Sequence, residues 1–302
     1  MNPRNLPDPT LANLYPPVRG YRYFEAASVL PFAPAAGAQA PANIWWLAEH
    51  ALLAYDQPAT IEAALEPHGY RAACFADRAS STFAYAAIGA DHGVLSFRGT
   101  EALTPGDSLF KLGDVVRDWL TDARFARRGF DDAGRVHAGF GDALERIWPG
   151  LESVLAQAPR WWCTGHSMGA ALAALAAVRI GRRGDTLAAL ATFGQPRTGC
   201  ANFALRLDAL PCVRVVNACD LVPRMPPERL GFAHAGTLLH LDAEQFTRYG
   251  ATVRGHLRRL PATLKHGVGA LTPIELIDHA PLYYAIKCCN AALARLERPD
   301  AG

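Results

Sequence analysis

The chain has 302 residues, half of them hydrophobic, and a formal net charge of +2 at pH 7. This length can bury one sizeable core, and the near-neutral charge gives no general attraction to nucleic acid. No stretch approaches the roughly 18 uncharged apolar residues of a transmembrane helix, and the first ten residues lack the apolar core of a signal peptide. The seven cysteines form no CxxC or metal-ligand spacing. We therefore expect reduced thiols, no metal or organic cofactor, and a cytoplasmic location, with leaderless secretion as the alternative.

The first 42 residues are interrupted by eight prolines, which predicts an irregular extension rather than a folded unit. We therefore assign residues 1–42 to a Pro-rich N-terminal extension and residues 43–302 to one domain. Apolar residues at helical spacing then predict a helix over residues 44–55, and a second short helix is expected over residues 58–65.

Strand and helix patterns alternate through the rest of the chain. Two strand-like runs, residues 82–88 and 93–98, are joined by a turn that suits a hairpin. Near-continuous apolar runs over residues 187–193 and 213–217 suit buried parallel strands, with a helix expected between them. This alternation implies right-handed crossovers and an α/β fold, with a mostly parallel central sheet flanked by helices.

Residues 161–180 contain the sequence Gly165-His166-Ser167-Met168-Gly169 between a short apolar run and an Ala/Leu-rich run. The flanking runs predict a strand before the serine and a helix after it. This context makes a G-x-S-x-G pattern a nucleophile elbow, in which the serine hydroxyl is presented on a sharp turn. His166 precedes the turn, so we expect it to be a structural neighbour rather than a catalytic base.

A serine nucleophile needs a histidine base, and the histidine needs a carboxylate to orient it. Asp220 directly follows a buried strand and is the favoured acid over Asp208 and Asp242. The histidines downstream of it are His234, His240, His256, His266 and His279. His279 precedes a helix expected over residues 281–296, which favours it, although composition alone does not separate it from His234.

The chain carries a set of motifs in a fixed order: LSFRGT (residues 95–100), VHAGF (136–140), TGHSMGAALA (164–173), TFGQPRTG (192–199), RVVN (214–217), DLVPR (220–224) and DH (278–279). This ordered set resembles the fungal-type triacylglycerol lipases, the class 3 lipases. The resemblance implies an α/β-hydrolase fold with Ser167 as nucleophile, Asp220 as acid and His279 as base. It also implies an oxyanion hole formed by Thr100 and the backbone N–H of Met168, a residue that is usually Leu in the family.

The expected activity is the hydrolysis of acylglycerol-type lipid esters through an acyl intermediate on Ser167. The alternatives are the same chemistry on a phospholipid, a thioester or a feruloyl-type ester, or a non-catalytic lipid-binding or scaffold protein of the same fold. The expected partner is a lipid or other ester substrate, with transient contact to a lipid interface. The sequence indicates no transmembrane segment, no nucleic acid and no obligate protein partner.

Two further segments carry alternative interpretations. Residues 102–119 place an apolar stripe at helical spacing, formed by Leu109, Leu112, Val116 and Trp119. This stripe suits either a mobile lid over the site or a helix packed permanently on the core. The basic segment 248–265 suits a solvated face better than a membrane-surface adaptor.

Overall fold

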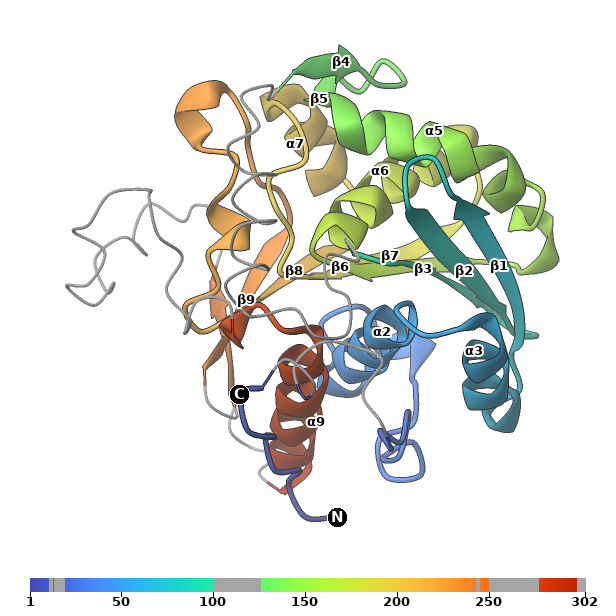
Figure 1. The fold of residues 1–302 in the computed structure, drawn as a ribbon, viewed down its shortest axis with the longest axis vertical. Coiled ribbons are helices and arrows are strands. Elements are labelled where there is room, and N and C mark those ends of the chain that lie inside the picture. Colours follow the sequence, from blue (N-terminus) through green and yellow to red (C-terminus); the bar gives the residue numbers. More distant parts are fainter. Residues whose placement is uncertain (11–12, 14–19, 100–125, 243–244, 250–276, 298–302) are drawn as a thin grey trace.

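The computed structural model describes residues 1–10, 13, 20–99, 126–242, 245–249 and 277–297. Within these residues, one sheet of eight strands has the order β1-β2-β3-β6-β7-β8-β9-β10 (Figure 1). The strands are β1 (Arg71–Asp77), β2 (Thr82–Ile88), β3 (Gly93–Phe97), β6 (Trp161–His166), β7 (Leu187–Phe193), β8 (Cys212–Asn217), β9 (Thr237–Asp242) and β10 (Gln245–Tyr249).

The centre of the sheet is parallel. Strands β3, β6, β7, β8 and β9 pair in parallel, whereas β1 and β2 pair antiparallel at one edge and β10 pairs antiparallel with β9 at the other. The carboxyl ends of the parallel strands therefore meet along one edge, which is where sites in such sheets are built. This arrangement confirms the predicted α/β class with a mostly parallel sheet.

Helices cover both faces of the sheet (Figure 1). One face carries α5 (Ala138–Glu152), α6 (Met168–Arg183) and α7 (Ala201–Asp208), and the other carries α2 (Pro41–Leu53), α3 (Pro58–Leu65) and α9 (Pro281–Glu297). Each face has its own hydrophobic core, one centred on α5 and α6 and the other on α2 and α9. Short 3-10 turns lie at Pro34–Ala36, Glu66–His68, Leu155–Gln157, Val222–Arg224 and Glu228–Leu230.

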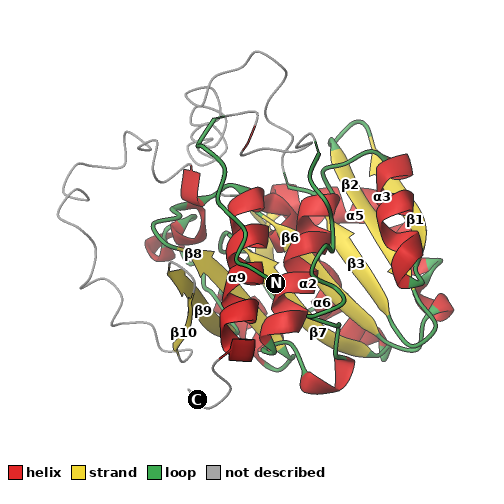
Figure 2. Cartoon of the chain, turned by 90° about the horizontal axis from the view of Figure 1, so that it is seen from below, coloured by secondary structure: helices red, strands yellow, loops and turns green. Residues whose placement is uncertain are grey.

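The described part of the N-terminal extension is fixed to the α2 and α9 face (Figure 2). Glu49 of α2 is completely buried and accepts hydrogen bonds from the Tyr21 hydroxyl at 2.7 Å and the Phe24 N–H at 3.2 Å. Asn290 of α9 accepts from the Arg4 N–H at 2.7 Å and donates to the Arg4 carbonyl at 2.9 Å. These bonds satisfy polar groups that burial would otherwise leave without partners, so the extension is part of the packed structure.

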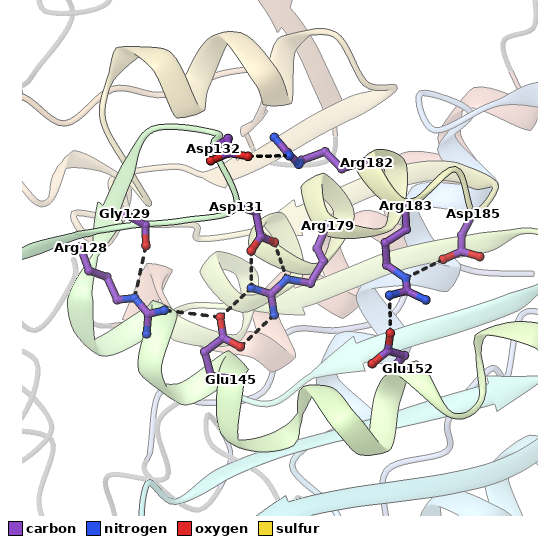
Figure 3. A network of polar contacts seen from close by, with 10 residues as sticks. All are labelled: Arg128, Gly129, Asp131, Asp132, Glu145, Glu152, Arg179, Arg182, Arg183 and Asp185. Carbon is purple, nitrogen blue, oxygen red and sulfur yellow. Dashed lines mark hydrogen bonds and ion pairs between the residues drawn. The ribbon is translucent and has the colours of Figure 1, made fainter.

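A small hairpin, β4 (Arg127–Gly129) and β5 (Arg135–His137), is joined to the helices by the ionic network of Figure 3. Arg179 of α6 binds both carboxylate oxygens of Asp131 in the hairpin turn, at 2.5 and 2.9 Å, and Glu145 of α5 at 2.6 Å. Its guanidinium also stacks over Phe130 at 4.6 Å and Trp148 at 4.9 Å. Bidentate pairing and stacking together fix the turn against α5 and α6.

Candidate active site

Ser167 lies alone between the end of β6 and the start of α6. Its φ is 58° and its ψ is −126°, a conformation that L-residues rarely adopt. The Ser167 N–H donates to the Phe193 carbonyl at 3.0 Å, and the Ala170 N–H donates to the Ser167 carbonyl at 3.0 Å. The neighbouring strand and the first turn of α6 therefore hold the strained serine in place.

The two glycines of the motif let the turn pack this tightly. A Cβ on Gly165 would overlap the Gly169 carbonyl, and a Cβ on Gly169 would overlap the Phe97 carbonyl at the end of β3. Both obstacles are backbone atoms that cannot rotate away. A side chain at either position would force α6 away from the sheet and move Ser167.

His279 lies just before α9 and contacts both Ser167 and Asp220. Its Nε2 is 2.9 Å from the Ser167 Oγ, and its Nδ1 is 2.9 Å from the Asp220 Oδ2. Asp220 is 1% exposed and His279 is 3% exposed, so bulk water does not compete for the contact between them. Because a carboxylate can only accept, Nδ1 carries the proton and Nε2 is left as an acceptor for the Ser167 hydroxyl.

The Asp220 carboxylate has two further donors besides His279. The Val222 N–H donates to Oδ1 at 2.9 Å, and the Tyr284 hydroxyl of α9 donates to Oδ2 at 2.6 Å. Burial and the adjacent Asp220 charge raise the pKa of Tyr284 well above its usual value, so its hydroxyl keeps the proton that it donates. The Tyr284 hydroxyl also accepts from the Asn217 N–H at 3.0 Å, which fixes its position.

Gly194, the residue after β7, packs directly against Asp220 and His279. Its φ is 58°, and a Cβ added to it would lie 2.8 Å from the Asp220 Oδ2 and 2.9 Å from the His279 Cε1. Real Cβ contacts are ordinarily at 3.4 Å or more. Glycine is therefore required here both by the backbone conformation and by the space that the acid and base occupy.

The segment that carries His279 is held by polar contacts from β8 and the turn after it. Asn217 donates its amide to the Asp278 carbonyl at 2.8 Å, and the Cys219 N–H donates to the Asp278 carboxylate at 3.0 Å. Lys287 of α9 donates to the Asn217 Oδ1 at 2.8 Å. The imidazole is thus positioned from its main chain as well as from its ring.

The alternative acids and bases make other contacts. The partly buried His234 is 2.6 Å from the Pro223 carbonyl through Nε2, and His240 is 3.0 Å from the Ala218 carbonyl. Asp208 accepts from the Gly236 N–H at 2.5 Å. Asp242 ends β9 and is exposed. His256 and His266 lie outside the described residues.

The predicted oxyanion hole is described only in part. Met168 is the first residue of α6, where backbone N–H groups point toward an anion near Ser167. Thr100 lies outside the described residues, and so do the segment 102–119 and the part of the basic segment from 250 to 265. The predicted roles of Ser167, Asp220, His279, Thr100 and Met168 are taken up as proposals below.

Sequence reasoning did not assign Gly194 and Tyr284 to the site. In the sequence, Gly194 ended an apolar strand and belonged to the TFGQPRTG motif, and Tyr284 was an aromatic residue in a helix, but neither was linked to Asp220 or His279. The available signal was positional: a glycine directly after a central parallel strand lies at the edge where the acid and base converge.

A strained serine after a central parallel strand, with an acidic residue and a histidine following later in the chain, is the arrangement used by serine hydrolases of the α/β-hydrolase type. Residues 94–230 match the family model described as Lipase (class 3). Over these residues the chain is similar to the class 3 lipases.

The curated relatives are fungal lipases. The chain is 34% identical over 142 residues to a lipase of Rhizomucor miehei, covering 42% of this chain and 39% of that protein. It is 32% identical over 138 residues to secreted mono- and diacylglycerol lipase 1 of Fusarium solani, covering 42% of this chain and 41% of that protein. The matched part is therefore about two fifths of the length of these relatives.

Solved lipase structures share the fold. Lipase II from Rhizopus niveus has a TM-score of 0.54 and 25% identity, covering 65% of this chain and 79% of that one. A triacylglycerol lipase described as having a serine protease triad has a TM-score of 0.56 and 24% identity, covering 68% of this chain and 81% of that one. These likenesses confirm the predicted α/β-hydrolase fold.

The predicted cytoplasmic location is wrong. Relatives from Fusarium solani and Malassezia restricta are named as secreted lipases, which points to an extracellular location. The prediction was wrong because it took cysteines without a disulfide or metal spacing as a sign of a reducing compartment. Cys163, Cys212, Cys288 and Cys289 are buried free thiols. A buried thiol without a partner stays reduced in any compartment, so it carries no information about location.

Proposed function

We propose that the protein is a serine esterase that hydrolyses carboxylic esters of lipids, of the acylglycerol type. The observation that carries this proposal is the position of His279. Its ring bonds the Ser167 Oγ at 2.9 Å on one side and the Asp220 carboxylate at 2.9 Å on the other. This geometry lets a neutral imidazole remove the serine proton while the buried carboxylate stabilises the imidazolium that forms.

The reaction runs in two steps. The Ser167 Oγ attacks the ester carbonyl carbon as its proton passes to the His279 Nε2, and that proton then goes to the leaving alcohol as the C–O bond breaks. Water next attacks acyl-Ser167, gives a proton to the His279 Nε2, and the acid leaves as Ser167 recovers the proton. The developing oxyanion is stabilised by the Met168 N–H at the start of α6 and by Thr100 as the second donor.

The substrate class rests on the relatives. Several are named mono- and diacylglycerol lipases, and a solved neighbour is named a triacylglycerol lipase. Among the described residues, no helix is long and apolar enough to cross a membrane. We expect transient contact with a lipid interface, because a fungal lipase–inhibitor complex with a TM-score of 0.57 is described as a model for interfacial activation. We also propose that residues 43–302 form the catalytic domain and residues 1–42 its extension.

A fluorophosphonate probe tests the nucleophile directly. The wild type should be labelled and should hydrolyse p-nitrophenyl esters, and Ser167→Ala should lose both, with a fall in kcat on the order of 10⁶. Unlabelled wild-type protein that binds lipid would support the non-catalytic alternative instead. The substrate class is assigned by comparing the hydrolysis rates of emulsified acylglycerol, phospholipid and thioester. Faster hydrolysis of the phospholipid or the thioester would overturn the acylglycerol assignment.

A further inference from the structure

His166, the residue before the nucleophile, makes contacts that the proposed reaction does not use. It ends β6, and its ring is 2% exposed. Its Nε2 lies 2.7 Å from the main-chain carbonyl of His279, and its Nδ1 lies 2.8 Å from the Tyr55 hydroxyl. The rings of His166 and His279 are 4.5 Å apart between centroids. The side chain therefore bridges the strand that carries the nucleophile and the segment that carries the base.

These partners determine the protonation of His166. A carbonyl oxygen can only accept, so Nε2 must carry a proton and donate it. Burial lowers the pKa of His166 well below its usual value, and the neighbouring His279 lowers it further, so the ring is neutral. Nδ1 is then an acceptor, and the Tyr55 hydroxyl donates to it. Tyr55 thereby fixes the His166 tautomer that donates to His279.

We infer that His166 is a positioning residue for the base, held in its donor tautomer by Tyr55. The inference rests on the proposed function. His279 is bonded by two adjacent residues: Ser167 meets its ring and His166 meets its main chain. A base held at both ends keeps the Nε2 to Oγ distance as its ring gains and loses a proton. A neutral His166 also places no second positive charge beside the imidazolium that forms during turnover.

The test compares His166→Phe, His166→Gln and a control on a soluble p-nitrophenyl ester. His166→Phe fills the space without a donor and should lower kcat about 10- to 100-fold with KM little changed, because misplacement by a fraction of an ångström is costly at a reacting centre. His166→Gln retains an N–H donor and should recover most of kcat. His50→Phe is the matched control. His50 is another buried histidine bonded to a tyrosine, with its Nδ1 2.8 Å from the Tyr85 hydroxyl, and this variant should keep kcat in the folded fraction.

Tyr55→Phe tests the contact between the Tyr55 hydroxyl and the His166 Nδ1. It also provides a test of the inference if His166→Phe does not fold. It should lower kcat about 3- to 10-fold, and combining it with His166→Phe should add little, because both changes act through one contact. ¹⁵N-edited NMR of His-labelled protein at pH 7 should show His166 protonated at Nε2 alone, with the Nδ1 signal moving in Tyr55→Phe.

The outcomes separate the two proposals. Wild-type protein that neither hydrolyses esters nor takes the fluorophosphonate label would refute the proposed function. If the wild type is active, the role of His166 can still be refuted by the variants or by NMR. His166→Phe with an unchanged kcat, or with an effect on KM alone, would refute it. So would a failure of His166→Gln to restore kcat, or an NMR spectrum that places the proton on Nδ1.

Discussion

Replacement of Gly194 by alanine should impair both catalysis and folding. The new Cβ would lie 2.8 Å from the Asp220 Oδ2 and 2.9 Å from the His279 Cε1, whereas ordinary contacts begin at 3.4 Å. The acid and base must therefore withdraw by about 0.5 Å, which we expect to lower kcat about 10- to 100-fold. The positive φ imposes a backbone cost in the folded state that lowers the free energy of unfolding by about 1–2 kcal/mol.

Gly184→Ala separates the two effects. Gly184 caps the C-terminus of α6 with a φ of 80°, and a Cβ there meets nothing within 4 Å. This variant should show the backbone cost alone, about 1 kcal/mol by urea unfolding, with kcat unchanged. The reasoning fails if Gly194→Ala loses no more stability than Gly184→Ala and hydrolyses a soluble ester at the wild-type rate.

Local sequence chemistry predicted the centre of the fold. Residues 82–88 and 187–193 form strands with the predicted bounds, because continuous apolar runs suit strands buried on both faces. The edge strands β1 and β10, and β9 next to β10, were not predicted. The β1 residues alternate between exposed and half-buried and carry no strong apolar signal, so pairing with β2 rather than local preference makes them a strand.

The candidate site could likewise be predicted only in part from the sequence. The elbow around Ser167 could be predicted because strand, glycines and helix are adjacent in sequence. His279 could not be separated from His234 by composition, since each is a histidine with a ring nitrogen close to a hydrogen-bond acceptor. The fold decides between them by bringing residues 112 positions apart to 2.9 Å. Contacts such as Tyr284 with Asp220 depend on tertiary packing, which no local pattern encodes.

Three further predictions concern single side chains. Tyr284→Phe removes one donor from the buried Asp220 and should lower the free energy of unfolding by about 1.5–3 kcal/mol and kcat several-fold; equal kcat would show that the bond has no part in positioning the acid. Arg179→Met leaves Asp131 without its arginine partner and Glu145 with Arg128 alone, and should cost about 1–2 kcal/mol in urea unfolding with kcat intact, whereas a silent change would mean that solvent already satisfies both carboxylates. Acid should destabilise the fold through His50, because burial lowers its pKa to about 3 while the unfolded chain titrates near 6.5. Between these values the unfolded state binds the extra proton, so stability present above pH 6.5 is lost as the pH falls toward 3. His50→Asn cannot take up that proton. As the pH falls, its free energy of unfolding should decrease less steeply than that of the wild type, with the two slopes differing by up to about 1.4 kcal/mol per pH unit. Parallel slopes would show that His50 is not the group that titrates.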